Sequence, residues 1–273
     1  MGIGKSKQTG QIDRLVNSIW RNSYFRGLNN LYSKSISINA ARAAGAQGPT
    51  FLILDQVDQQ LDKDTLPSTL TNLSINKYNQ PLLPNVLPKG LKTLTLMGFN
   101  QVFSAGVLPS SMTDLSLPNI NRQLKPYSLP DSLTHLDIKQ YTGSLSFQVL
   151  NELSTLEIKH LYPCVTAAIW GTNSITITCN KFSPWINLQQ TPIQHLKIHL
   201  NSPDRVTLKT EFIPKDIRSL RLCGFKIESP GLIPKSCLYL ETDIIDLNTE
   251  FIPSTTIHTF YDDKGKDDVS NKI

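Results

Sequence analysis

Two of the sequence's short motifs have the residue types and spacing for lipidation or ligand binding, and the first is at residues 2–6. With Met1 in front, this stretch, GIGKS, fits the pattern M-G-x-x-x-[ST], in which Gly2 becomes N-myristoylated. The same letters resemble the end of a phosphate-binding loop, but that loop needs the full GxxxxGK[ST] motif after a strand. Gly2 is therefore a candidate for lipidation, and we expect no nucleotide site.

The second motif is a histidine pair, His195 and His199, with the H-x-x-x-H spacing that holds zinc on a helix. The residues around them alternate apolar and polar as in a β-strand, where residues four apart lie about 13 Å from each other. One ion cannot bridge that distance, so no metal site is predicted. The four cysteines have no C-x-x-C spacing and are expected to be free thiols in a reducing cytosol: Cys164, Cys179, Cys223 and Cys237.

A carboxylate pair, Asp137 and Glu157, is the remaining candidate for chemistry, because the repeats described next place the two side by side. An open sheet lacks the enclosure that prepares a carboxyl group for acid–base catalysis. There is also no G-x-S-x-G motif in the sequence. We therefore expect neither an enzyme nor a cofactor.

The elements that must position these residues follow a repeat. The stretch LPKGLKTLTLMGFNQ, residues 87–101, returns with variations on both sides, and its proline recurs every 21 residues at Pro67, Pro88, Pro109 and Pro130. A fixed period of this length is typical of a solenoid. An L-x-[LI] pair marks a strand with one buried face in each coil. The pairs are Leu52/Leu54, Leu73/Ile75, Leu94/Leu96, Leu115/Leu117, Leu136/Ile138, Leu156/Ile158, Ile175/Ile177, Leu196/Ile198, Leu220/Leu222 and, weakly, Leu238/Leu240.

About ten coils result, and because each returns to the same pattern after one turn, their strands must be parallel. Further columns are predicted to hold the coils together. Three residues after each strand comes an apolar column: Tyr78, Phe99, Ile120, Tyr141, Leu161 and later Phe225. Beside it, Asn79, Asn100 and Asn121 are predicted to form a buried asparagine ladder, which Thr142 continues.

Residues 77–82, KYNQPL, and 98–101, GFNQ, are each followed by LPxxLxxLxL, and this pattern resembles the FNIP repeat family over residues 66–141. The resemblance fades after residue 150, where the FNQ corner is lost. It implies a leucine-rich-repeat-like fold and a protein-interaction role. The predicted fold is thus a mainly β repeat solenoid, a parallel-stranded leucine-rich-repeat-like array of about ten coils with an N-terminal helical cap.

The predicted organisation has three parts. Residues 1–48 form a basic segment with a capping helix, residues 49–261 form the solenoid, and residues 262–273 form a disordered charged tail. The basic character lies at the start, since residues 1–50 contain seven Lys or Arg against one Asp, whereas the remainder has 20 basic and 21 acidic residues. Without a secretory signal or a long apolar run, we expect a cytoplasmic protein, with a peripheral membrane position as the variant.

The exposed face of the sheet is the predicted working surface, because solenoids bind partners on their concave side. Its partner-binding candidates are His135, Asp137, Lys139, Glu157, Lys159, His195, Lys197 and Arg221. Asp137 should lie beside Glu157 and Lys139 beside Lys159, so that acidic and basic columns pair diagonally.

The leading hypothesis is a monomeric, non-catalytic module that binds another protein. The first alternative is a membrane adaptor held by a myristoylated, basic N-terminus, since one acyl chain needs a second signal. The second is a substrate-recognition subunit of a ubiquitin ligase. Nucleic acid is not expected, because the repeats are nearly neutral and offer no aromatic stacking platform.

Overall fold

The computed structural model describes residues 36–37, 50–57 and 60–261. The predicted capping helix within residues 1–48, the lipidation candidate Gly2 and the charged tail of residues 262–273 lie outside this part of the chain. Among the described residues, no helix is long and apolar enough to cross a membrane.

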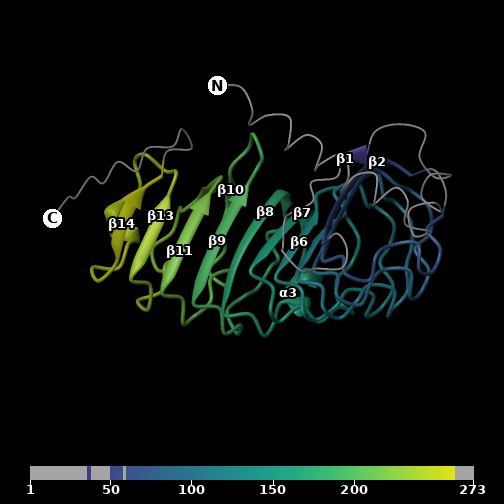
Figure 1. Cartoon of the computed structure of the whole chain (residues 1–273). Helices are drawn as coiled ribbons and strands as arrows, with labels where there is room; N and C mark the ends of the chain where they lie inside the picture. The colour runs from purple at the N-terminus through teal and green to yellow at the C-terminus, as the bar shows by residue number, and fades with distance from the viewer. Residues whose placement is uncertain (1–35, 38–49, 58–59, 262–273) are drawn as a thin grey trace, which may run out of the picture.

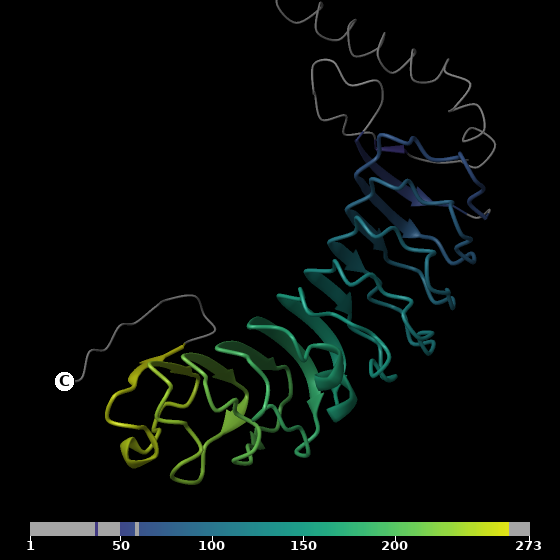
Figure 2. The same cartoon turned by 90° about the horizontal axis from the view of Figure 1, so that it is seen from below.

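One curved sheet of twelve strands organises the molecule, in the order β1-β2-β3-β4-β5-β6-β7-β8-β9-β11-β13-β14. Figure 2 shows this sheet on the concave side of an arc, with the returning loops on the convex side. Figure 1 shows the strands side by side, from β2 to β14 near the C-terminal end. The strands are β1 (Ile36–Ser37), β2 (Phe51–Gln56), β3 (Asn72–Lys77), β4 (Thr93–Leu96), β5 (Asp114–Ser116), β6 (His135–Ile138), β7 (Thr155–Leu161), β8 (Ser174–Phe182), β9 (His195–Leu200), β11 (Ser219–Cys223), β13 (Tyr239–Thr242) and β14 (Ile257–Phe260).

Only three short elements and a helix depart from this plan in the described chain. A second sheet pairs β10 (Val206–Thr207) with β12 (Phe225–Lys226) on the returning side. The helix α3 (Pro163–Ala168) replaces the convex loop of one coil, and a 3-10 helix, η1 (Thr249–Phe251), lies in the last. Of the twelve strands, β1 alone pairs antiparallel, which leaves eleven parallel strands separated by ten turns of chain. The prediction of about ten parallel coils is confirmed.

The register follows the 21-residue spacing through the first coils. Leu73 lies opposite Leu52 and Leu94, and Leu136 lies opposite Leu115 and Leu156. These leucines are buried, since alternate residues of a strand point to the same face. Each therefore packs on its equivalents in the coils before and after.

Two strand registers were predicted wrongly. Leu156 lies opposite Ile177 and not Ile175, because β8 is nine residues long and meets β7 two residues further along than it meets β9. This offset brings the buried Cys179 into the core as a small apolar residue, and burial raises the pKa of its thiol to about 12. A search for Leu and Ile passes over such a position.

The second wrong register is in β13, where the buried pair is Leu240 and Thr242 while Leu238 is 42% exposed. The hydroxyl of the buried Thr242 has a partner, since its Oγ1 lies 3.0 Å from His258 Nε2 in β14. His258 stands opposite Leu240, in the core-facing column of the final strand, and desolvation there lowers its pKa. A hydrogen-bonded Thr–His pair thus takes the place of leucines where the array ends.

The predicted apolar column after the strands is confirmed as part of the core. Its six members are all buried, and the rings of Tyr78 and Phe99 stack with their centroids 6.3 Å apart. Phe182 of β8 also belongs to this region, where it packs edge-on against Phe212 and Phe225 at 5.1 Å. That residue was not predicted, because the two-residue offset of β8 hides its place in the repeat.

The asparagine ladder exists, but at an exposed corner and not inside the core as predicted. The amide N–H of Asn100 donates to Asn79 Oδ1 at 2.8 Å, and that of Asn121 donates to Asn100 Oδ1 at 3.0 Å. Both Asn79 and Asn121 are exposed. The ladder therefore ties the backbone of each coil to the side chain of the coil before it, and it ends before Thr142, which makes no such bond among the described residues.

A further column occupies the convex turn, three residues before each proline. The backbone there is left-handed in four successive coils, with φ of 64°, 63°, 77° and 54° at Asp64, Asn85, Gly106 and Tyr127. Asn, Asp and Gly are the residues that tolerate this conformation, whereas a tyrosine in it is strained. Tyr127 is also 64% exposed, so packing does not compensate the strain.

The change Tyr127→Asn should therefore raise the free energy of unfolding by about 0.5–1 kcal/mol, because asparagine fits the left-handed turn with less strain. Urea unfolding followed by circular dichroism measures this gain. The reciprocal change Asn85→Tyr should cost a similar amount at the equivalent turn. A loss of stability in Tyr127→Asn would show that the tyrosine ring stabilises its turn.

Candidate interaction surface on the concave face

All eight predicted partner-binding residues lie on the concave face, because they alternate with the buried residues of their strands. They come from four strands and the residue after one of them: His135 and Asp137 from β6, Lys139 just after it, Glu157 and Lys159 from β7, His195 and Lys197 from β9, and Arg221 from β11. Each is exposed or half-buried. The structure separates them into two groups, divided by β8.

On the side of β6 and β7 lies a cluster that we call the acidic zone: Asp137, Glu157 and Lys139 together with Asp114 of β5. Asp137 and Glu157 are register partners, as predicted. Lys139 Nζ lies 2.9 Å from Glu157 and 3.7 Å from Asp137, which confirms the predicted diagonal pairing. The hydrogen bond to Glu157 raises the pKa of Lys139. The zone keeps a negative balance, with three carboxylates around one lysine.

Asp114 of the acidic zone and its neighbour Ser116 were not predicted from the sequence. Asp114 lies 3.2 Å from His135 Nδ1, and Ser116 Oγ donates to Asp137 Oδ2 at 2.9 Å. Both stand 21 residues before the residue that they contact, so the repeat spacing could have identified them. The other oxygen of Asp137, Oδ1, is buried and has no hydrogen-bond partner among the described residues.

The acidic zone surrounds a shallow depression in the sheet. Its volume is about 190 Å³, and side chains of β4, β5, β6 and β7 line it. Sites for small organic ligands usually measure about 300–1,000 Å³. The depression is smaller than that, but it has room for a side chain of a binding partner.

On the side of β9 and β11, the three outward side chains of β9 form what we call the basic strip: His195, Lys197 and His199. On one side they face Ser174, Thr176 and Thr178 of β8, in that order. On the other side they face Ser219, Arg221 and Cys223 of β11. The extended strand separates the two histidines as expected, and within the described chain no three His, Cys, Asp or Glu side chains gather into a metal site.

The charge of Arg221 is neutralised by a carboxylate of the next strand. Its Nε donates to Glu241 Oε2 at 2.6 Å, and its guanidinium lies 4.7 Å from the ring centroid of Tyr261. Lys159 has no ion pair in the described part of the chain and donates to Gln140 Oε1 at 3.0 Å. Lys139 and Lys159 were predicted to lie side by side. In the structure their ammonium groups have different partners, since Lys139 pairs with the two carboxylates and Lys159 hydrogen-bonds a side-chain amide.

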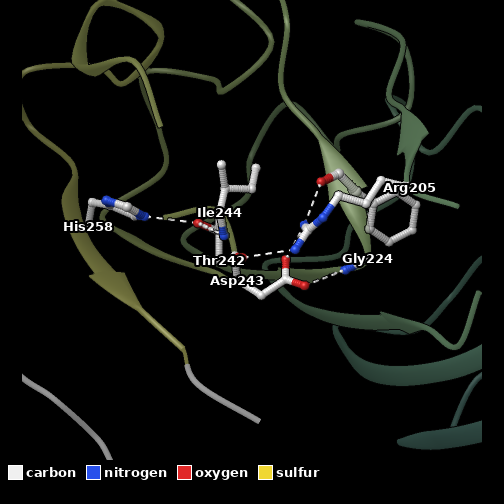
Figure 3. A network of polar contacts seen from close by, with 7 residues as sticks. Arg205, Gly224, Thr242, Asp243, Ile244 and His258 are labelled. Atoms are coloured by element: carbon white, nitrogen blue, oxygen red, sulfur yellow. Dashed lines mark hydrogen bonds and ion pairs between the residues drawn. The ribbon is translucent and has the colours of Figure 1, made fainter. Parts of the chain in front are cut away.

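A polar network joins the residues that follow β9, β11 and β13 (Figure 3). Arg205 donates to Asp243 Oδ1 at 2.8 Å and to the carbonyl of Phe225 at 3.1 Å. Asp243 Oδ2 accepts the backbone N–H of Gly224 at 3.1 Å. A hollow of about 440 Å³ lies beside this network, and its lining runs from His199 to Arg205 and Asp243. The basic strip therefore leads into a polar hollow at its C-terminal end.

Comparison with known proteins finds a similarity to one repeat family over part of the chain. The sequence model of the FNIP Repeat matches residues 58–98, 78–119 and 99–141. The search of curated proteins gave no match. Among solved structures, CroV588, described as a novel circular LRR protein, superposes with a TM-score of 0.58 at 24% identity, over 77% of this chain and 33% of that one. The present chain thus spans about a third of that protein, and the likeness concerns the fold. Neither match indicates an enzyme family.

Proposed function

We propose, from the premise that residues 58–141 are FNIP repeats within a leucine-rich-repeat-like solenoid, that this protein is a non-catalytic module that binds another protein on its concave face. The observation that carries this proposal is that the inward and outward residues of each strand have different roles. The inward residues repeat from coil to coil and build the core, whereas the outward residues change from coil to coil and make no contribution to it.

The composition of the face supports a protein partner. An interaction surface needs groups that can recognise a partner by charge and shape. The concave face offers an acidic zone with a depression at β4–β7, a hydroxyl-bearing row on β8, and a basic strip on β9. A partner that spans these strands would meet opposite charges about two strands apart, which fixes its orientation as well as its affinity.

The test reverses the charge of the acidic zone. Tagged wild-type protein and the double variant Asp137→Lys/Glu157→Lys are used for proximity labelling in native cells, and the two sets of labelled proteins are compared. A matched double variant, Asp131→Lys/Glu152→Lys, reverses two exposed carboxylates on the convex turns. We expect the concave variant to lose specific proteins that the convex variant keeps.

Because the reversed side chains would stand beside Lys139, the milder double variant Asp137→Asn/Glu157→Gln is included, and thermal melting confirms that each variant folds. An identical set of labelled proteins from the wild type and both concave variants would contradict the proposed function. The N-terminal helical cap, the lipidation of Gly2 and the cytoplasmic location stay predictions of the sequence.

A further inference from the structure

The basic strip differs from the other charged groups of the concave face because its side chains have no hydrogen-bond or ion-pair partner among the described residues. Three of the protein's five histidines are hydrogen-bonded: His135 to Thr134, His160 to Tyr162 and His258 to Thr242. The other two are His195 and His199. Within the part of the chain that the structure describes, neither they nor Lys197 between them makes a side-chain hydrogen bond or ion pair.

Lys197 also has an electrostatically unfavourable neighbour. Its register partners are Thr176 on β8 and Arg221 on β11, so one neighbour is neutral and the other carries the same charge. Like charges directly opposite each other in a sheet are destabilising. By contrast, Lys139 is held between two carboxylates, and Arg221 bonds to Glu241 on its other side. The fold gains nothing from the charge of Lys197, which is therefore left for a partner.

Hydroxyl groups flank the strip in register. Ser174, Thr176 and Thr178 form an outward row along β8, and Ser219 lies across from His195 on β11. In the described chain their hydroxyls have no hydrogen-bond partner. Lysine, histidine and hydroxyl groups are all donors to oxyanions, and bonds from a charged donor to a carboxylate or phosphoryl group are about twice as strong as neutral ones.

The spacing of the strip defines the shape of what it binds. Outward residues of β9 follow one another at about 6.7 Å, which is two strand residues. An extended peptide presents alternate side chains with the same spacing. Acidic side chains at positions i, i+2 and i+4 of such a segment would therefore each meet one donor of the strip. The polar hollow beyond His199 provides space for the segment to continue.

We propose that the basic strip binds an extended acidic segment of the partner protein, with carboxylates or phosphorylated side chains at alternate positions. This inference rests on the proposed function, since it names the chemistry of the partner at the β8–β11 end of the same face. Lys197 makes the central contact, His195 and His199 the outer ones, and the hydroxyls of β8 complete the donor set.

The test uses full-length protein and fluorescein-labelled eight-residue peptides in a fluorescence anisotropy titration. The first peptide alternates Thr and Glu, the second has phosphothreonine in place of Glu, and the third has the first peptide's composition with its four Glu adjacent. The alternating acidic peptides should bind, and the tighter of the two identifies whether carboxylate or phosphoryl groups are preferred. The clustered peptide should bind more weakly, and equal binding would overturn the extended register.

The variant Lys197→Gln should weaken binding of the alternating peptide about tenfold, as expected when a charge-assisted hydrogen bond of about 1.4 kcal/mol is lost. The same substitution at Lys89, an exposed lysine of a convex turn, should leave the affinity within about twofold, since surface charges there contribute little. Equal losses in the two variants would overturn the proposal. So would tighter binding to phosphatidylserine vesicles or to polyuridylate than to any acidic peptide.

Failure of this inference can be told apart from failure of the proposed function. If no acidic peptide binds while Asp137→Lys/Glu157→Lys still loses its labelled proteins, the strip does not bind an acidic segment but the concave face is an interaction surface. If the peptides bind through Lys197 and the labelled proteins are unchanged, the strip binds an acidic segment while the proposed function, as tested at the acidic zone, fails.

Discussion

Replacing Phe99 with alanine is expected to lower the free energy of unfolding by about 3–5 kcal/mol. The ring is fully buried, stacks on Tyr78 of the coil before and packs 6.1 Å from the ring of Phe103 in its own coil. Removing it leaves a cavity at the junction of two coils, which the stiff 21-residue repeat cannot close by collapse. Urea unfolding followed by circular dichroism measures the loss.

The matched control is Phe147→Ala, which removes the same ring from a convex turn where it is 61% exposed. That change should alter stability by less than about 0.5 kcal/mol. Because each coil of a solenoid contacts mainly its neighbours, the Phe99 cavity should also weaken the coupling between coils. Hydrogen exchange should therefore accelerate first in β3 and β4. A similar cost for both variants would contradict the assignment of Phe99 to a continuous core column.

The interior columns could be predicted from sequence because two periods fix them at once. Alternation within the strand decides which residue points inward, and the 21-residue return decides which residue of the next coil it meets. Leu94, for example, has only one possible pair of neighbours under both rules, Leu73 and Leu115, and it has them in the structure. Where both periods hold, the fold follows from spacing alone.

The errors came where a residue outside the expected types filled an inward position. Cys179 is a core residue in β8, and Thr242 is one in β13 because His258 satisfies its hydroxyl. Neither is visible to a search for paired leucines, since burial of a polar group depends on a partner from a different coil. The left-handed turn at Tyr127 was missed for a related reason, as tyrosine gives no sign of that backbone conformation.

Some contacts of the candidate interaction surface could likewise be predicted from the repeat, and others could not. That Asp137 and Glu157 lie side by side follows from the repeat, and so does their diagonal contact with Lys139. The isolation of Lys197 could not be predicted, because it depends on which neighbouring side chains are already bonded. Arg221 turns toward Glu241, and only the structure shows that this leaves Lys197 with no carboxylate within reach among the described residues.

Gly224→Ala is the second substitution with a large expected effect, a loss of about 2–5 kcal/mol in the free energy of unfolding. Gly224 has φ of 84°, and a Cβ added there would lie 2.4 Å from the carbonyl oxygen of Leu200 in the neighbouring coil. The left-handed backbone alone costs alanine about 1–2 kcal/mol, and the overlap adds strain of the size found on overpacking a core. The shift that relieves it would pull the Gly224 N–H from Asp243.

Two other glycines separate the cost of the left-handed backbone from the cost of the steric overlap. Gly231 has φ of 79°, and apart from its chain neighbours no described residue has an atom within 4 Å of an added Cβ, so Gly231→Ala should cost only the conformational part, about 1–2 kcal/mol. Gly90 has an equally open surrounding without a left-handed backbone, so Gly90→Ala should be neutral or stabilising by up to about 1 kcal/mol. Chemical unfolding of the three variants under one set of conditions ranks their changes in the free energy of unfolding. Equal losses of unfolding free energy at Gly224 and Gly231 would mean that the coil of Leu200 moves to make room for the new methyl group. In that case, close backbone approach would not fix the spacing of the coils at this edge of the concave face.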